Sequence, residues 1–97
     1  MSPDPLKGAV DAALVPILAA VAAWEVTEAH WLPDRDGVPV IYFRTRTEAQ
    51  QSALAGQRWL MSQVQVTMTR LGVPYETVRR LRIEVTSAQA EARLFEE

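Results

Sequence analysis

A chain of 97 residues suits one domain with a single modest core, and we expect residues 1–97 to form one domain. Its formal net charge of −2 gives no strong pull toward nucleic acid or an anionic membrane. The absence of cysteine excludes a disulfide framework, a zinc ribbon and a thiol nucleophile.

The N-terminal part of the chain predicts a long apolar helix over about residues 5–24. Its apolar residues extend beyond one stripe, which indicates burial on more than one side and suggests a second subunit. Pro16 predicts a kink, or a helix start near Val15. The uncharged run, residues 12–24, has 13 residues, too few to span a bilayer. Asp4 and Asp11 before it are untypical of a signal peptide, so we expect a buried helix in a cytoplasmic protein without membrane contact.

A β-hairpin follows this helix. Residues 24–32 and 38–46 are rich in β-branched and aromatic side chains and predict two strands. Between them, Pro33-Asp34-Arg35-Asp36-Gly37 has the residue types of a turn. Asp34 and Asp36 lack the further oxygen ligands of a calcium loop, so the turn explains them better.

One long helix is predicted over residues 47–71. Thr47 and Gln50 form a capping box at its start, while Gly72 and Pro74 end it. Residues 77–87 then alternate between apolar and charged side chains and predict a half-buried strand. Residues 87–97 predict a short final helix that Ser87 caps.

These elements predict an α+β fold of order α-β-β-α-β(-α). We expect a three-stranded, mainly antiparallel sheet in the order 2-1-3, covered on one face by two helices, in a half-ferredoxin-like arrangement. The alternative puts strand 3 parallel beside strand 2. We favour the antiparallel order, because strand 3 is polar on one face and parallel sheets are usually covered on both. The expected core residues are Phe43, Leu54, Val64 and Ile83.

The strand alternation also predicts a charged sheet face that points away from the helices. Its members form the candidate ligand face: Glu28, His30, Tyr42, Arg44, Arg82 and Glu84. In a functional interpretation His30 transfers protons, Glu28 or Glu84 orients it, and Arg44 and Arg82 hold an anion. The simpler interpretation is a solvated face with cross-strand Arg–Glu pairs.

Other chemistry finds little support in the sequence. His30 is the only histidine and no cysteine accompanies it, so we expect no metal site and no cofactor. The four glycines stand apart from one another and form no phosphate loop. One arginine group is a candidate for nucleic-acid binding, although exposed aromatic residues beside it are few. This group consists of Arg44, Arg46, Arg79, Arg80 and Arg82.

We therefore expect a small interaction or regulatory module without catalysis, acting by self-association, as a homodimer, or by binding another protein. The apolar surface exceeds what a chain of this size buries easily. The expected interface residues are Val38, Val40, Tyr42 and Trp59, with strand 2 pairing across a two-fold axis at the sheet edge. The alternative function is binding of an anionic ligand or of nucleic acid on the charged face around His30, Arg44 and Arg82. Catalysis on the same face is less favoured.

Overall fold

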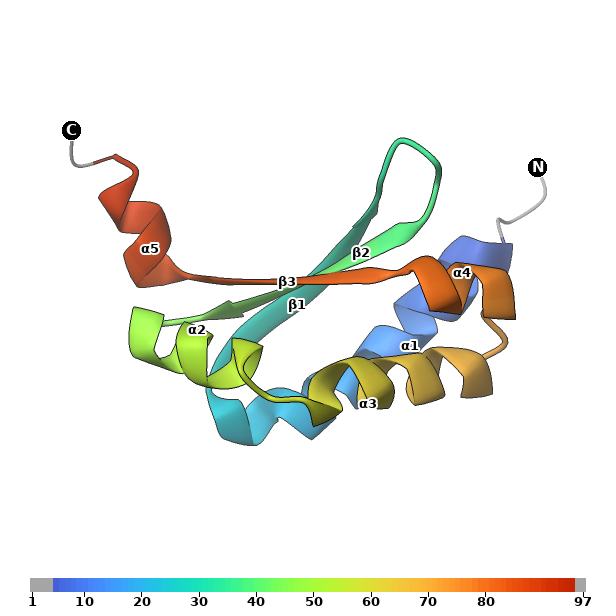
Figure 1. The fold of residues 1–97 in the computed structure, drawn as a ribbon, viewed down its shortest axis with the longest axis horizontal. Helices are drawn as coiled ribbons and strands as arrows, with labels where there is room; N and C mark the ends of the chain where they lie inside the picture. The colour runs from blue at the N-terminus through green and yellow to red at the C-terminus, as the bar shows by residue number, and fades with distance from the viewer. Residues whose placement is uncertain (1–4, 96–97) are drawn as a thin grey trace.

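A computed structural model describes residues 5–95, with helices on one side of a three-stranded sheet (Figure 1). The elements in chain order are α1 (Pro5–Val21), the 3-10 helix η1 (Ala22–Trp24), β1 (Val26–Pro33), β2 (Pro39–Thr45), α2 (Glu48–Ala55), α3 (Trp59–Arg70), α4 (Tyr75–Arg80), β3 (Arg82–Ser87) and α5 (Ala88–Arg93). The α+β class is confirmed.

The sheet is mixed, with β2 in the centre. β1 runs antiparallel to β2, and β3 runs parallel to β2, with Ile41 opposite Ile83 and Phe43 opposite Val85. The predicted antiparallel sheet of order 2-1-3 is therefore wrong, and the alternative with strand 3 parallel beside strand 2 is correct. The half-ferredoxin description rested on the 2-1-3 order and finds no support.

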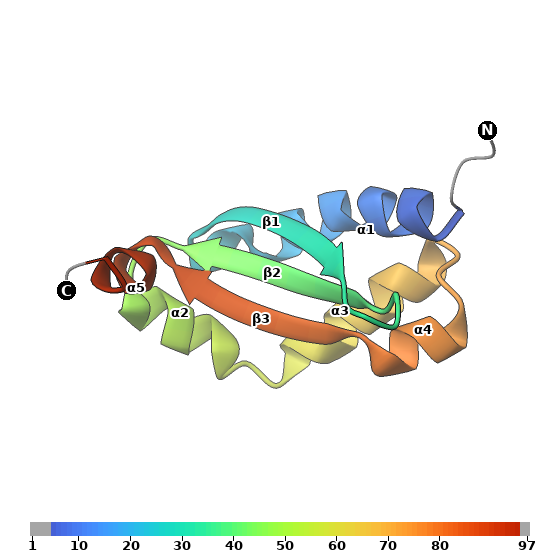
Figure 2. The ribbon, with the colours of Figure 1, turned by 90° about the horizontal axis from the view of Figure 1, so that it is seen from above.

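The physical reason lies in how the sheet is covered. Helices α1, α2 and α3 all lie on one side, and the described chain has no element across the other (Figures 1 and 2). A parallel strand is buried on both faces only when crossover helices cover both. Since the helices that build the core, α1, α2 and α3, all use the same side, β3 keeps a charged face and still pairs in parallel.

The core forms between this helical layer and the covered side of the sheet. Its fully buried side chains include Ile17 of α1, Phe43 of β2 and Met68 of α3. Of the predicted core residues, Phe43, Leu54 and Val64 are completely inaccessible, whereas Ile83 on the outer strand β3 is only partly buried. Edge strands have a neighbour on one side only, which accounts for the difference.

The predicted single helix over residues 47–71 is two helices. Its start is as expected: Thr47 accepts a hydrogen bond from the Gln50 N–H, and the Gln50 side chain returns one to the Thr47 N–H. The break follows Gly56, which ends α2. The Gln57 amide group donates to the Ala53 carbonyl, which stabilises the helix end that the break exposes.

The predicted strand 3 begins too early, because residues 75–80 form α4. Pro74 cannot continue a strand ladder but suits the start of a helix. Glu76 in the first turn and Arg79 in the last turn each carry the charge that the helix dipole favours at that end. The two side chains also form an ion pair, with Arg79 Nη2 2.8 Å from Glu76 Oε2. The shorter β3 leads into α5, where Ser87 accepts a hydrogen bond from the Ala90 N–H as the predicted cap. Residues 96–97 of the predicted final helix lie outside the described part.

Helix α1 continues through Pro16 to Val21, so the alternative start near Val15 is wrong. Together α1 and η1 make 20 residues, Pro5–Trp24, with a mean hydropathy of 1.8 in the most apolar stretch. Within the described residues this is the one helix long and apolar enough to cross a membrane by length and composition. The predicted helix over about residues 5–24 thus has the observed extent, and the uncharged run of 13 residues is only part of it. A core helix of a soluble protein and a signal sequence meet the same criterion, and a cytoplasmic location stays a prediction.

Candidate binding face

The strand register brings all six residues of the candidate ligand face to the uncovered side of the sheet. We call this surface the open face, and three cross-strand rows compose it: Glu28–Arg44–Thr86, His30–Tyr42–Glu84 and Leu32–Val40–Arg82. The intervening residues of the same strands, such as Ile41 and Phe43, belong to the buried core. The alternation read from the sequence therefore assigned the two faces correctly.

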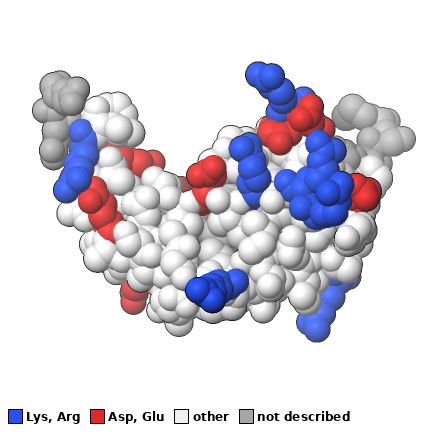
Figure 3. Space-filling model, in the orientation of Figure 1, with Lys and Arg blue, Asp and Glu red and all other residues white. Residues whose placement is uncertain are grey.

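The open face is hollowed. The space-filling view shows a concave upper surface between an arm formed by the β1–β2 turn and an arm formed by α5 (Figures 1 and 3). From above, the three strands lie in view without an element across them (Figure 2). A concave surface surrounded by raised elements can contact a partner over more of its area than a flat one.

An aromatic pair lies in the middle row of the open face. The rings of His30 and Tyr42 stack with centroids 4.9 Å apart and planes inclined by 12°. Tyr42 is half-buried on the central strand, whereas His30 on the outer strand is exposed. Stacking orders the two rings while leaving part of their surface in solvent, so the pair adds accessible aromatic surface to the middle of the open face.

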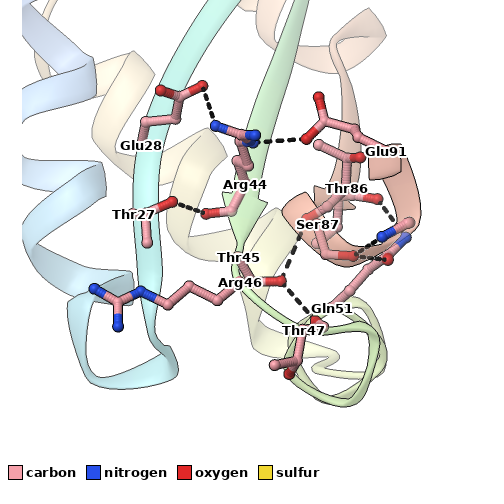
Figure 4. Close-up of polar contacts among 12 residues, drawn as sticks. Thr27, Glu28, Arg44, Thr45, Arg46, Thr47, Gln51, Thr86, Ser87 and Glu91 are labelled. Atoms are coloured by element: carbon pink, nitrogen blue, oxygen red, sulfur yellow. Dashed lines mark hydrogen bonds and ion pairs between the residues drawn. The ribbon is translucent and has the colours of Figure 1, made fainter. Parts of the chain in front are cut away.

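Arg44 already has two carboxylates as partners, which leaves its guanidinium group less available to bind an anion. Its Nε donates to Glu91 Oε2 at 2.6 Å, and its Nη1 lies 4.0 Å from Glu28 Oε1 (Figure 4). Glu91 belongs to α5, so these contacts attach α5 to the sheet. The predicted Arg–Glu pairing across strands is confirmed for Arg44 and Glu28.

His30 has no group that would orient it for proton transfer. Apart from its stacking on Tyr42, it has no hydrogen bond and no ion pair among residues 5–95. Glu28 is occupied by Arg44. A general acid or base needs a partner that fixes its ring, and the described residues supply none to His30.

The arginines predicted as one nucleic-acid group are separated by the fold. Arg44 is paired as above, and Arg79 is paired with Glu76. Arg46 directly follows the last residue of β2, Thr45 (Figure 4), whereas Arg82 pairs with Val40 near the start of β2. Arg80 and Arg82 instead join Arg35 of the β1–β2 turn around a surface hollow of about 550 Å³, with Asp34 and Val38 completing the lining. Sequence reasoning missed Arg35. A turn that brings its tip near the start of β3 is set by long-range pairing, and no local signal reveals it.

The four predicted interface residues lie in different surroundings. Val38 and Val40 are 7% and 3% exposed, which leaves little of either side chain for a partner. Trp59 packs against Trp24 with ring centroids 5.9 Å apart, and its indole N–H donates to Gln57. Tyr42 remains accessible on the open face. The edge argument fails for β2, because β2 is the central strand. An interface role for these residues stays a prediction.

A polar network stabilises the α5 end of the sheet. Buried Ser87 donates to Gln51 Oε1, and the Gln51 amide donates to the Val85 carbonyl (Figure 4). Thr45 donates to the Thr47 and Thr86 carbonyls. Every buried side-chain oxygen and nitrogen of the described residues has a hydrogen-bond partner. These contacts account for structure and leave no buried polar atom that calls for a ligand.

Metal chemistry has no candidate in residues 5–95, where no three acidic or histidine side chains come close enough to hold an ion. The carboxylate of Asp34 accepts hydrogen bonds from the Asp36 and Val38 N–H groups at 2.8 and 3.0 Å. Its carboxylate therefore fixes the turn, as predicted.

Comparison with known proteins brings no assignment, because no family model, curated protein or solved structure matches this chain.

Proposed function

We propose that the protein is a non-catalytic binding module and that its open face receives a protein partner. The observation that carries this proposal is the sheet face itself. It is concave, no element of the described chain lies across it, and an exposed aromatic pair occupies its middle row.

The residues of the open face suit partner binding by their composition. Leu32 is 55% exposed and extends the apolar area of the His30–Tyr42 pair along β1. Charged residues lie on the outer strands, with Glu28 on β1 and both Arg82 and Glu84 on β3. Interfaces commonly combine aromatic anchors near the centre with a polar rim. The arrangement thus supports contact with a partner surface rather than with a small apolar ligand.

Catalysis is the weaker interpretation of the same face. The proton-transfer hypothesis needed an oriented His30 and a free Arg44. His30 lacks an orienting partner in the described chain, and Arg44 is held by Glu28 and Glu91. Nucleic-acid binding also has less support, because one stacked aromatic pair is a small platform for bases and Arg44 is neutralised.

The partner is either a second copy of the chain or another protein, and we retain the homodimer as the first alternative. The sheet has two outer strands, β1 and β3, each paired on one side only. Light scattering on a sizing column at about 100 μM, far above the dissociation constant of a stable dimer, separates the two alternatives. A clean monomer would point to a different protein.

Site-specific photo-crosslinking tests the proposal. A photoreactive phenylalanine analogue replaces His30 on the open face or, as a control, Val66 on α3, which is 48% exposed on the helical side. We expect the analogue at position 30 to give a defined protein crosslink in cells of the source organism and position 66 to give none. Equal crosslinking from both positions, or crosslinking from position 66 alone, would contradict the proposal.

A further inference from the structure

The arginines that form no ion pair within the described chain are not spread evenly over its surface. The five ion pairs use Lys7, Arg44, Arg79 and Arg93 as their cations. Six arginines have no ion pair within residues 5–95: Arg35, Arg46, Arg58, Arg70, Arg80 and Arg82. Three of these six line the same surface hollow. Like charges repel each other, and Asp34 is the one carboxylate among the residues that line this hollow, so the grouping requires an explanation.

Three separate elements supply the side chains of this hollow, which we call the arginine hollow. Arg35 comes from the β1–β2 turn, Arg80 from the last residue of α4 and Arg82 from the first residue of β3. Val38 and Asp34 complete its lining. In the space-filling view, positive and negative side chains gather on the arm formed by the turn, where the hollow lies (Figure 3).

The one carboxylate in the lining is already engaged. Asp34 Oδ1 accepts the N–H groups of Val38 and Asp36, which fixes the turn. The Val38 N–H, assisted by the Asp36 N–H and by the charges of Arg82 and Arg80, holds the pKa of Asp34 below its ordinary value. Asp34 thus stays ionised at neutral pH. Among the lining residues, one carboxylate against three guanidinium groups leaves a formal surplus of two positive charges, and Glu76 outside the lining also attracts Arg80.

Hydrogen bonds of the main chain fix the backbone at Arg35 and Arg82, two of the arginines that line the hollow. The turn that bears Arg35 is closed by the Asp34 N–H bond to the Val38 carbonyl and the Gly37 N–H bond to the Asp34 carbonyl. Gly37 has a φ of 80°, which a residue with a side chain adopts only under strain. Arg82 is held by its pairing with Val40. A site on backbone fixed in this way loses less entropy when it binds.

We infer that the arginine hollow binds a phosphate-type oxyanion. Each guanidinium group offers planar, paired N–H donors that match the oxygens of a phosphate group, and a phosphate dianion neutralises the two surplus charges. Arg82 also belongs to the open face, so the bound anion would lie at one end of that face. This inference does not depend on the proposed protein partner, and either proposal can fail alone.

Titration of the whole chain with inorganic phosphate, at an ionic strength kept constant with sodium chloride, tests the inference by NMR. We expect saturable shifts of the backbone amides of Arg35, Gly37 and Arg82, with a dissociation constant of about 1 mM or lower at low salt. Inorganic pyrophosphate as a second probe distinguishes a site for one phosphate group from a site for two. Shifts that do not saturate, or that spread over the surface without a focus at these amides, would overturn the inference.

Charge-neutralising variants supply the matched comparison. Arg82→Gln and Arg80→Gln should each weaken phosphate binding about tenfold, since each removes charge-assisted hydrogen bonds to the anion. Arg46→Gln removes the same charge at the other end of β2 and should change binding less than about twofold. An equal loss in Arg46→Gln would show unspecific attraction and overturn the inference. If Arg82→Gln does not fold, Arg35→Gln in the exposed turn decides the question by the same criterion.

Discussion

The covered side and the open face of the sheet are built by alternate residues of the same three strands, yet they differ in every physical property. On β2, Ile41 and Phe43 are completely buried against the helices, while Tyr42 and Arg44, which alternate with them, remain partly exposed. The covered side is apolar and tightly packed. The open face carries rings and charges that contact each other and, through Arg44, Glu91 of α5.

This difference separates stability from binding. Burial of apolar area against α1, α2 and α3 supplies most of the folding free energy, and it depends on side chains that a partner cannot reach. The side chains of the open face contribute little to the free energy of folding, so they can be substituted with little loss of stability. Substitutions on the two faces should therefore have effects on stability of very different size.

Phe43→Ala should give the largest effect. Phe43 is 0% exposed at the centre of the core, and its truncation leaves a large cavity that the neighbouring side chains fill only in part. We expect a loss of about 3–5 kcal/mol in the free energy of unfolding, measured by urea denaturation. A loss under about 1 kcal/mol would mean that the covered side does not pack as described.

Ser87→Ala should give an intermediate effect, because Ser87 is buried on the covered side but contributes hydrogen bonds rather than apolar packing. Its hydroxyl accepts the Ala90 N–H at the start of α5 and donates to Gln51 Oε1, and the residue is fully buried. Removing the cap and leaving Gln51 short of a donor should cost about 1–2 kcal/mol in urea denaturation. Ser62→Ala on an exposed position of α3 is the control and should change stability little.

Asp34→Asn should show a smaller effect that depends on pH. The folded-state pKa of Asp34 is lowered from 3.8, first by the Val38 N–H and then by the Asp36 N–H and nearby arginines. A carboxylate with a lowered folded pKa stabilises the fold above its unfolded pKa and loses that contribution as pH falls through the folded value. Wild type should thus be more stable than Asp34→Asn at pH 7, and the gap should narrow below about pH 4. A gap that widens as the pH falls would contradict the assigned role.

His30→Ala should have the smallest effect on stability. Its ring is exposed, stacks only on Tyr42 and has no hydrogen bond in the described chain. We expect a change within about 0.5 kcal/mol by urea denaturation, even though the substitution removes half of the aromatic pair. A loss comparable with that of Ser87→Ala would mean that something covers the open face in solution.

Local sequence features predicted the parts of this fold that depend on local physics. The period of two assigned Phe43 to the core and Tyr42 to the open face, and hydrogen-bonding side chains marked the starts of α2 and α5 at Thr47 and Ser87. Gly56 was available as a signal for the break between α2 and α3. The apolar stripe nevertheless continues on both sides of Gly56 and therefore predicts one helix.

The strand order could not be predicted in the same way. Both orders bury the same residues of β3, so the hydrophobic pattern does not distinguish them. The candidate site shows the same limit. The sequence identified the six residues of the charged face, but Arg44 meets Glu91 across 47 positions of the chain and Arg35 meets Arg82 only after the sheet has formed. Which arginines stay free is thus a property of the tertiary structure.

The central claim is that one side of the sheet is covered and the other is open to a ligand. Paramagnetic relaxation of side-chain protons by a soluble gadolinium chelate measures this directly in the intact protein. The account predicts strong relaxation of the His30 and Tyr42 ring protons and almost none for Phe43 on the same strand as Tyr42. Protection of His30 and Tyr42 equal to that of Phe43, persisting on dilution, would show that the chain itself covers this face and would contradict the account.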